Sequence, residues 1–214
     1  MLKKLVIQLA VKLDNPIKKK SGKIATFSYL EEMYTTSEEH ARKYAKKCNA
    51  DYYVITDPND WIPGTGAHVA FQKFKVYDFL NYDRILYIDS DYIIKDTAPN
   101  IFDIVDNFAA IVDPGKTEHL AKNIGIPATR YFNSGFLHFT KEILEKSKDE
   151  ILKINLRNKW QLKDQAVWNK VMYDLNIDFI KLDSDSWNPS TKTFGLYGDH
   201  YSGTNKNKWG SVKY

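Results

Sequence analysis

Arg84-Ile85-Leu86-Tyr87-Ile88-Asp89-Ser90-Asp91 is the stretch that decides the fold. The apolar run predicts a buried strand, and two carboxylates separated by one small residue follow where that strand would end. Because residues i and i+2 share one face of a strand, Asp89 and Asp91 are expected to converge on one point. Two buried like charges repel unless a cation or a proton lies between them. The stretch therefore predicts a site for a hard divalent ion, Mg2+ or Mn2+, which prefers oxygen ligands.

Length and composition favour one ordinary globular domain. The chain has 214 residues, of which 43% are hydrophobic and 27% are charged. Its net charge of +4 does not indicate nucleic-acid binding, which needs a concentrated basic stripe. Cys48 is the only cysteine, so an internal disulfide is excluded. The sequence has no long apolar run and no signal-peptide pattern, so we expect no membrane span and a cytoplasmic location.

Short apolar runs alternate with amphipathic segments along the chain, without an internal repeat. Strands are expected over residues 2–11, 51–56, 84–89, 108–113, 132–139 and 177–182. Helices are expected from the capping box at residues 36–39 to about residue 48, and over 69–80, 101–107, 141–155 and 164–175. From residue 183 onward, loops are expected to dominate. This alternation predicts an α/β sheet covered by helices on both faces, with ligands bound beyond the carboxyl ends of its strands.

Four clusters of polar residues follow one another along the chain. They are Asp89-Ser90-Asp91, Phe132-Asn133-Ser134-Gly135, Asp164-Gln165, and His200-Tyr201-Ser202-Gly203 followed by Lys206 and Trp209. In this order the clusters resemble the glycogenin-like members of glycosyltransferase family 8. The resemblance implies a retaining, metal-dependent sugar transferase of GT-A fold. The fold that the resemblance implies is a single Rossmann-like α/β domain over residues 1–214, with a central mixed, mostly parallel sheet flanked by helices. It further implies a nucleotide-binding part over about 1–113 and a sugar and acceptor part over about 114–214.

The resemblance also implies roles for individual residues. Asp89, Asp91 and His200 match the ligands of Mn2+, with Mg2+ as the alternative ion. Asp164 and Gln165 match residues at the reacting sugar, Gln165 being nearest the anomeric carbon. The residues expected to bind a UDP-sugar donor are Leu9, Ala10, Val11, Lys73, Ser90, Asn133, Asp164, Gly203 and Lys206. The acceptor expected is a glycan or a glycoprotein.

The expected chemistry suits these residue types. A UDP leaving group departs with several negative charges, which a divalent ion and a lysine neutralise. Gln165 is a poor nucleophile, and a double displacement would require a carboxylate in its place. We therefore favour attack on the same face of the sugar over a covalent intermediate. The chain departs from the family at Lys206-Asn207-Lys208-Trp209, which replaces the usual Lys-Pro-Trp, and Lys206 is favoured over Lys208 on spacing.

Simpler interpretations compete with several of these roles. Lys73 could be an exposed helix residue, and Asn133-Ser134-Gly135 could be a turn that enters a strand. Asp164 could be a charge favoured by a helix dipole. The remaining histidines, His40, His68, His119 and His138, are interpreted as structural or solvated.

Two other functions compete with sugar transfer. One is an Asp-nucleophile phosphatase, in which Asp89 would attack phosphorus and Asp91 would act as acid or base. That class usually carries its motif on the first strand, whereas the motif here is on a later one. The other is a sugar-nucleotide binding module without activity. The sequence does not specify the sugar, the linkage or the oligomeric state.

Overall fold

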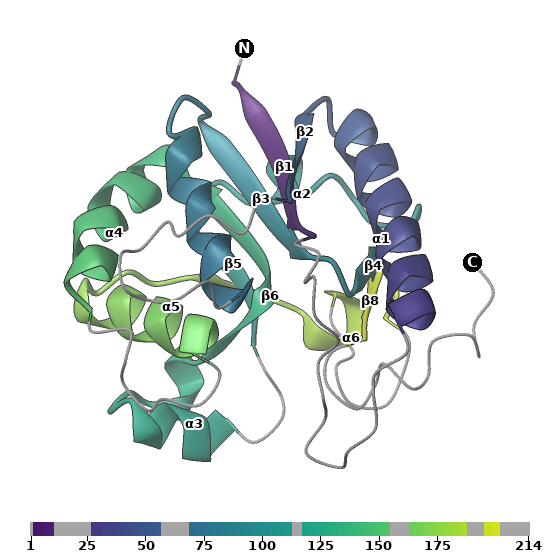
Figure 1. Ribbon diagram of the computed structural model, residues 1–214. Coiled ribbons are helices and arrows are strands. Elements are labelled where there is room, and N and C mark those ends of the chain that lie inside the picture. The colour runs from purple at the N-terminus through teal and green to yellow at the C-terminus, as the bar shows by residue number, and fades with distance from the viewer. Residues whose placement is uncertain are drawn as a thin grey trace.

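The computed structural model describes residues 2–10, 27–56, 69–112, 117–154, 163–187 and 195–201. Two sheets and the helices around them lie within these ranges (Figure 1). Over the same ranges, no helix combines the length and the apolar character that crossing a bilayer demands.

The main sheet has six strands in the order β2-β1-β3-β6-β5-β7. The strands are β1 (Lys4–Leu9), β2 (Asp51–Ile55), β3 (Arg84–Asp89), β5 (Ala109–Val112), β6 (Phe132–Thr140) and β7 (Ile180–Leu182). Strand β6 runs antiparallel to its neighbours β3 and β5, and the other neighbouring strands are parallel. The prediction of a mixed, mostly parallel sheet is confirmed, and each strand lies within or close to its expected range.

A second, two-stranded sheet joins β4 (Tyr92–Ile94) to β8 (Gly198–His200). Its strands are antiparallel, and Tyr92 pairs with His200. Loops were expected from residue 183 onward, which includes β8, since a three-residue strand is too short to show a periodic pattern. This pairing brings the C-terminal part of the described chain to the end of β3.

Helices cover both faces of the main sheet (Figure 1). They are α1 (Phe27–Lys47), α2 (Ile101–Ile104), α3 (Thr117–Asn123), α4 (Lys141–Lys153), α5 (Lys163–Asp174) and α6 (Ser184–Trp187), with 3-10 helices η1 (Val69–Phe79) and η2 (Ala128–Arg130). Successive side chains of each strand point to opposite faces of the sheet, so each face has its own hydrophobic core. On β1, Leu5 and Ile7 belong to the core under η1, α4 and α5, whereas Val6 belongs to the core under α1, α2 and α6.

The helix expected to begin at the capping box begins earlier, at Phe27, so that prediction is wrong. Ser37 lies inside α1 and is completely buried. Its hydroxyl donates to the backbone carbonyl of Tyr92 at 2.7 Å and accepts from Gln8 Nε2 at 2.8 Å. The serine therefore ties α1 to β1 and β4 instead of capping a helix, a long-range role that a local motif does not reveal.

Trp168 holds together the two helices that carry several of the predicted site residues. The indole of this α5 residue lies 5.1 Å from the ring of Phe74 and 5.5 Å from the ring of Tyr77, both on η1. It also lies 5.0 Å from Phe139 on β6. Such contacts add to the burial of apolar area, so α5 and η1 are fixed against the same face of the sheet.

His138 is a buried histidine on β6 that should make the fold sensitive to acid. Burial lowers the pKa of His138 to about 4, although a 2.8 Å contact between Nδ1 and the carbonyl of Asn107 favours the charged form. Because the unfolded chain takes up this proton near pH 6.5, acid favours the unfolded state. We predict that the free energy of unfolding falls by about 3 kcal/mol between pH 7 and pH 4 from this group.

Denaturant titrations of a His138→Gln variant across that pH range test this expectation. The glutamine amide can donate to the same carbonyl but does not titrate, so the variant should lose this part of the pH dependence. His119→Gln, a change of the same kind at an exposed position on α3, should keep it. An unchanged acid sensitivity in His138→Gln would contradict the assignment.

Candidate active site

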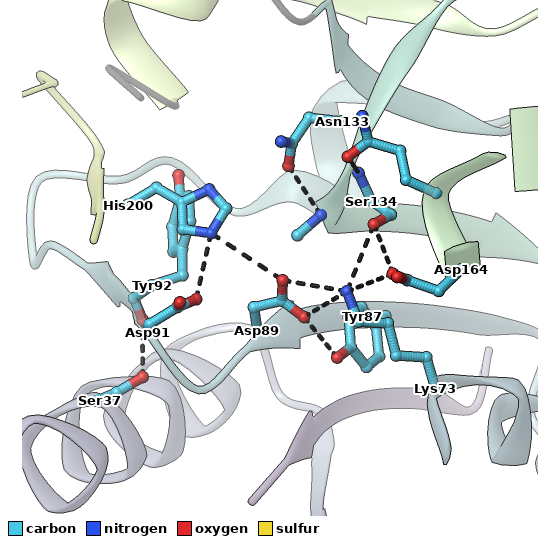
Figure 2. Close-up of polar contacts among 12 residues, drawn as sticks. Ser37, Lys73, Tyr87, Asp89, Asp91, Tyr92, Asn133, Ser134, Asp164 and His200 are labelled. Carbon is cyan, nitrogen blue, oxygen red and sulfur yellow. Dashed lines mark hydrogen bonds and ion pairs between the residues drawn. The ribbon is translucent and has the colours of Figure 1, made fainter. Parts of the chain in front are cut away.

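Two carboxylates and one imidazole lie together at the end of β3 (Figure 2). Each of Asp89, Asp91 and His200 offers a ligand atom, and these atoms lie within 4.8 Å of one another. His200 Nε2 is 3.1 Å from Asp91 Oδ1 and 3.9 Å from Asp89 Oδ2. Carboxylate oxygens and one imidazole nitrogen form a set that suits a divalent cation, so the three residues fit the expected metal.

The convergence of the two carboxylates has a different cause from the one expected. Asp89 is the last residue of β3, but Ser90 and Asp91 lie in the turn that leads to β4. Strand alternation therefore does not align the pair. The turn brings Asp91 back towards Asp89, and the β4–β8 pairing places His200 beside both. The backbone N–H of Tyr201 donates to the carbonyl of Asp91 at 2.8 Å, which anchors the turn to the C-terminal segment.

Asp199 secures the position of β8 beside the candidate metal ligands. Its carboxylate is buried and lies 3.0 Å from Lys95 Nζ. The same carboxylate accepts from the backbone N–H of Gly195 at 2.9 Å, and Lys95 donates to the carbonyl of Gly195 at 2.7 Å. Because a buried charge needs a partner and hydrogen bonds, this pair stabilises one arrangement of the segment before His200.

Lys73 lies at the centre of a second group of polar side chains next to the three ligands. Its Nζ is 2.9 Å from Asp89 Oδ1 and 2.8 Å from Asp164 Oδ2, and it is 3.3 Å from Ser134 Oγ (Figure 2). Burial alone would lower the pKa of Lys73, but the carboxylates of Asp164 and Asp89 outweigh it and raise this pKa above its ordinary value. Lys73 is thus a buried cation, and its interpretation as an exposed helix residue is wrong.

Asp164 and Gln165 reach the site from the first turn of α5. Asp164 Oδ2 accepts from Ser134 Oγ at 2.9 Å, so this carboxylate has specific partners beyond the helix dipole. Gln165 Oε1 accepts from the backbone N–H of Ser134 at 3.1 Å, while its buried Nε2 makes no hydrogen bond in the structure. Asn169 fixes this turn, because its side chain bonds both backbone groups of Phe132 at 2.8 Å.

The segment Asn133-Ser134-Gly135 is part of β6, so its interpretation as a turn is wrong. Asn133 Oδ1 accepts from the backbone N–H of Gly135 at 2.7 Å, which orients the amide. A Cβ at Gly135 would lie 2.5 Å from His200 Cε1 and 3.0 Å from Asp89 Oδ2. A hydrogen at this position is therefore what allows the imidazole and the carboxylate to approach each other.

The first strand ends beside the same site. Leu9 pairs with Asp89 in the parallel register of β1 and β3, and the N–H of Ala10 donates to the carbonyl of Ile55 at 2.9 Å. The expected nucleoside segment therefore starts next to the candidate metal ligands. Val11, Gly203 and Lys206, together with Lys208 and Trp209, lie outside the described residues.

The structure adds residues that the sequence analysis did not place in the site. Tyr87 is buried and donates its hydroxyl to Asp89 Oδ1 at 2.6 Å. Burial, and then the neighbouring Asp89, raises the pKa of Tyr87 well above its ordinary value, so the phenol stays a donor. Ser134 contacts Lys73 and Asp164. Tyr87 precedes Asp89 by two residues on the same strand face, a signal that could have identified it.

Comparison with known proteins identifies the family. The model of the family described as glycosyl transferase family 8 matches residues 13–209. The chain belongs to glycosyl transferase family 8. The resemblance stated from the four clusters is thereby confirmed, and this family 8 chain is a glycosyltransferase. A comparison with curated protein sequences finds no significant match.

Solved glycosyltransferases share the fold of this family 8 chain. One is involved in glycosylation of the major capsid of PBCV-1; the TM-score is 0.60, identity is 12%, and 98% of this chain and 100% of that chain are covered. The galactosyltransferase LgtC, solved with donor and acceptor sugar analogues, has a TM-score of 0.54 at 16% identity, and the match covers 93% of this chain and 87% of LgtC. Mouse xyloside xylosyltransferase 1 has a TM-score of 0.52 at 13% identity, and the match covers 95% of this chain and 98% of that chain. These likenesses confirm the expected GT-A fold.

The contact at Gly135 gives a testable prediction for this family 8 chain. Gly135→Ala should displace His200 from Asp89 and weaken the binding of a divalent cation at the candidate site by about tenfold or more, because the alanine methyl would overlap the imidazole. Mn2+ affinity and melting temperature would be measured together. In a His200→Ala background the same change should cost less stability, since the overlapping ring is gone. An equal loss of stability in both backgrounds would contradict this explanation.

Proposed function

We propose that the chain is a metal-dependent, retaining glycosyltransferase that moves a hexose or a related sugar from a UDP-sugar to a glycan or glycoprotein acceptor. The observation that carries this proposal is the position of three candidate metal ligands beside Asp164 and Gln165. The ligand atoms of Asp89, Asp91 and His200 lie within 4.8 Å of one another. Lys73 joins Asp89 to Asp164 by contacts of 2.9 and 2.8 Å. The proposed places for a metal-bound diphosphate and for a sugar would thus be adjacent.

Each proposed role follows from the chemistry of the side chains. Mn2+ is proposed as the ion, since a mixed carboxylate and imidazole set suits it better than Mg2+. When bound, the ion would neutralise charge on the departing diphosphate. His200 must be neutral to act as a ligand, so binding should weaken at acid pH. We propose that Lys206 offers a further positive charge, and that Leu9, Ala10, Val11, Ser90 and Gly203 bind the rest of the donor.

The residues around the sugar have complementary roles in this proposal. Asn133 and Asp164 would hold hydroxyl groups of the donor sugar and so fix its orientation. Gln165 is neutral, and its Oε1 already accepts from Ser134, so its Nε2 remains as a donor towards the sugar. A carboxylate nucleophile would be expected in a double displacement. We therefore propose same-face attack without a covalent intermediate; an inverted anomeric centre in the product, read by NMR, would exclude it.

The proposed division of the domain follows the same site. Residues 1–113 would bind the nucleotide, and residues 114–214 would bind the sugar and the acceptor. Asp89 and Asp91 belong to the first part, and His200 belongs to the second. The metal site would thus join the two parts. Membership of family 8 sets aside the phosphatase alternative, whereas a binding module without activity would bind UDP and metal but transfer no sugar.

Removal of one ligand tests the proposal. Asp91→Ala should lower UDP affinity in the presence of Mn2+ by about 100-fold, because the ion would lose a charged ligand. Isothermal titration calorimetry with UDP, in Mn2+ and in chelator, measures the effect. The matched control is Asp96→Ala, at an exposed position soon after β4, which should bind like the unmutated chain. Unchanged UDP affinity in Asp91→Ala would refute the metal assignment.

A further inference from the structure

The ammonium group of Lys73 has an acceptor within the protein for each of its N–H donors. A lysine ammonium has three N–H donors. Nζ has three acceptor residues within reach: Asp164 at 2.8 Å, Asp89 at 2.9 Å and Ser134 at 3.3 Å (Figure 2). Only 10% of the side chain is exposed. To touch a diphosphate, Lys73 would first have to move away from Asp89 or Asp164 and leave that carboxylate without its ion-pair partner.

We propose that Lys73 is a positioning residue that couples the metal site to the sugar site, and that it does not act as a ligand of the diphosphate. The proposal rests on the proposed function, since it takes Asp89 as a metal ligand and Asp164 as a sugar-binding residue. The structure supports it by the shared contact alone: one cation bridges one carboxylate from each site. Coupling of this kind is reciprocal, so each site would influence affinity at the other.

The division of Asp89 between its partners explains how the coupling would work. Oδ1 accepts from Tyr87 at 2.6 Å and lies 2.9 Å from Lys73 Nζ. Oδ2 lies 3.1 Å from Nζ and 3.9 Å from His200 Nε2, so it faces both Lys73 and the other candidate ligands. A metal ion on Oδ2 and the ammonium of Lys73 therefore compete for the same carboxylate.

Asp164 determines how strongly Lys73 competes with a metal ion for the carboxylate of Asp89. While Asp164 is charged, the ammonium is shared between two carboxylates. When that charge is removed, Lys73 interacts with Asp89 alone and opposes a metal ion there more strongly. At separations of 3 to 4 Å, with little water between, such a change is large compared with thermal energy. The charge of Asp164, which is not one of the metal ligands, should thus control metal affinity through Lys73.

Titration of the chain with Mn2+, in the absence of any nucleotide, tests this inference. Asp164→Asn should weaken Mn2+ binding by about tenfold in the otherwise unmutated chain. In a Lys73→Met background the same change should weaken it by about twofold or less, because the bridging cation is absent. If Asp164 acted on the ion only through space, the loss would be equally large in both backgrounds, and the proposal would be overturned.

Matched variants on α5 control for a general effect of charge. Lys170 and Asp174 form an ion pair at 2.6 Å on that helix, and Asp174 is exposed. Asp174→Asn should leave Mn2+ affinity unchanged. Lys73→Gln serves as a second neutral background in case the methionine variant does not fold, because the glutamine amide can still donate to the carboxylates. In this background too, Asp164→Asn should weaken Mn2+ binding by about twofold or less.

The outcomes separate this inference from the proposed function. Mn2+-dependent UDP binding by the unmutated chain, with no change of Mn2+ affinity in Asp164→Asn, would overturn the coupling and leave the function standing. An unmutated chain that binds no divalent ion would overturn both. A tenfold loss that vanishes without the ammonium of Lys73 would support the coupling and the metal site on which the proposed function rests.

Discussion

The repulsion among three carboxylates gathered at one end of the sheet is the constraint on which the site depends. Asp89, Asp91 and Asp164 carry three negative charges in a partly buried setting, and the ammonium of Lys73 offsets one of them. The carboxylates and Lys73 together leave two negative charges. A divalent cation would balance them, which gives a physical reason for the arrangement of the candidate ligands around Asp89. The buried phenol of Tyr87 contributes a hydrogen bond without adding charge.

The fold creates this concentration of charge through the direction of one strand. Because β6 runs antiparallel to β3, its first residues lie beside the last residues of β3, and Ile88 pairs with Phe136. The segment that carries Asn133 and Ser134 is thereby brought to the carboxyl ends of the parallel strands. Trp168 holds α5 and η1 on the same face of the sheet, which places Asp164 and Lys73 at that edge as well. The small β4–β8 sheet completes the site with His200.

The sequence predicts the main sheet and the carboxylates of Asp89 and Asp91 because these leave strong local signals, whereas His200 is expected only from the resemblance to family 8. An apolar run that ends in two carboxylates indicates both a strand and its functional end, as in residues 84–91. Other features depend on contacts between distant residues. The place of Ser37 inside α1, the need for glycine at position 135 and the saturation of Lys73 are of this kind. The short strand β8 offers too few residues for a periodic pattern, so its role appears only in the fold.

Release of UDP from a panel of UDP-sugars would show whether this chain transfers sugar and whether the transfer needs a metal ion. The unmutated chain would be incubated with each UDP-sugar and with a mixture of glycan and glycoprotein acceptors, in Mn2+ or in a chelator. The sugar would pass to an acceptor or to water, and the free UDP left behind would be measured over time. A metal-dependent transferase should release UDP from at least one donor in the presence of Mn2+ and should lose that release in chelator. Equal release with and without the ion, or no release from any donor, would contradict the proposed function.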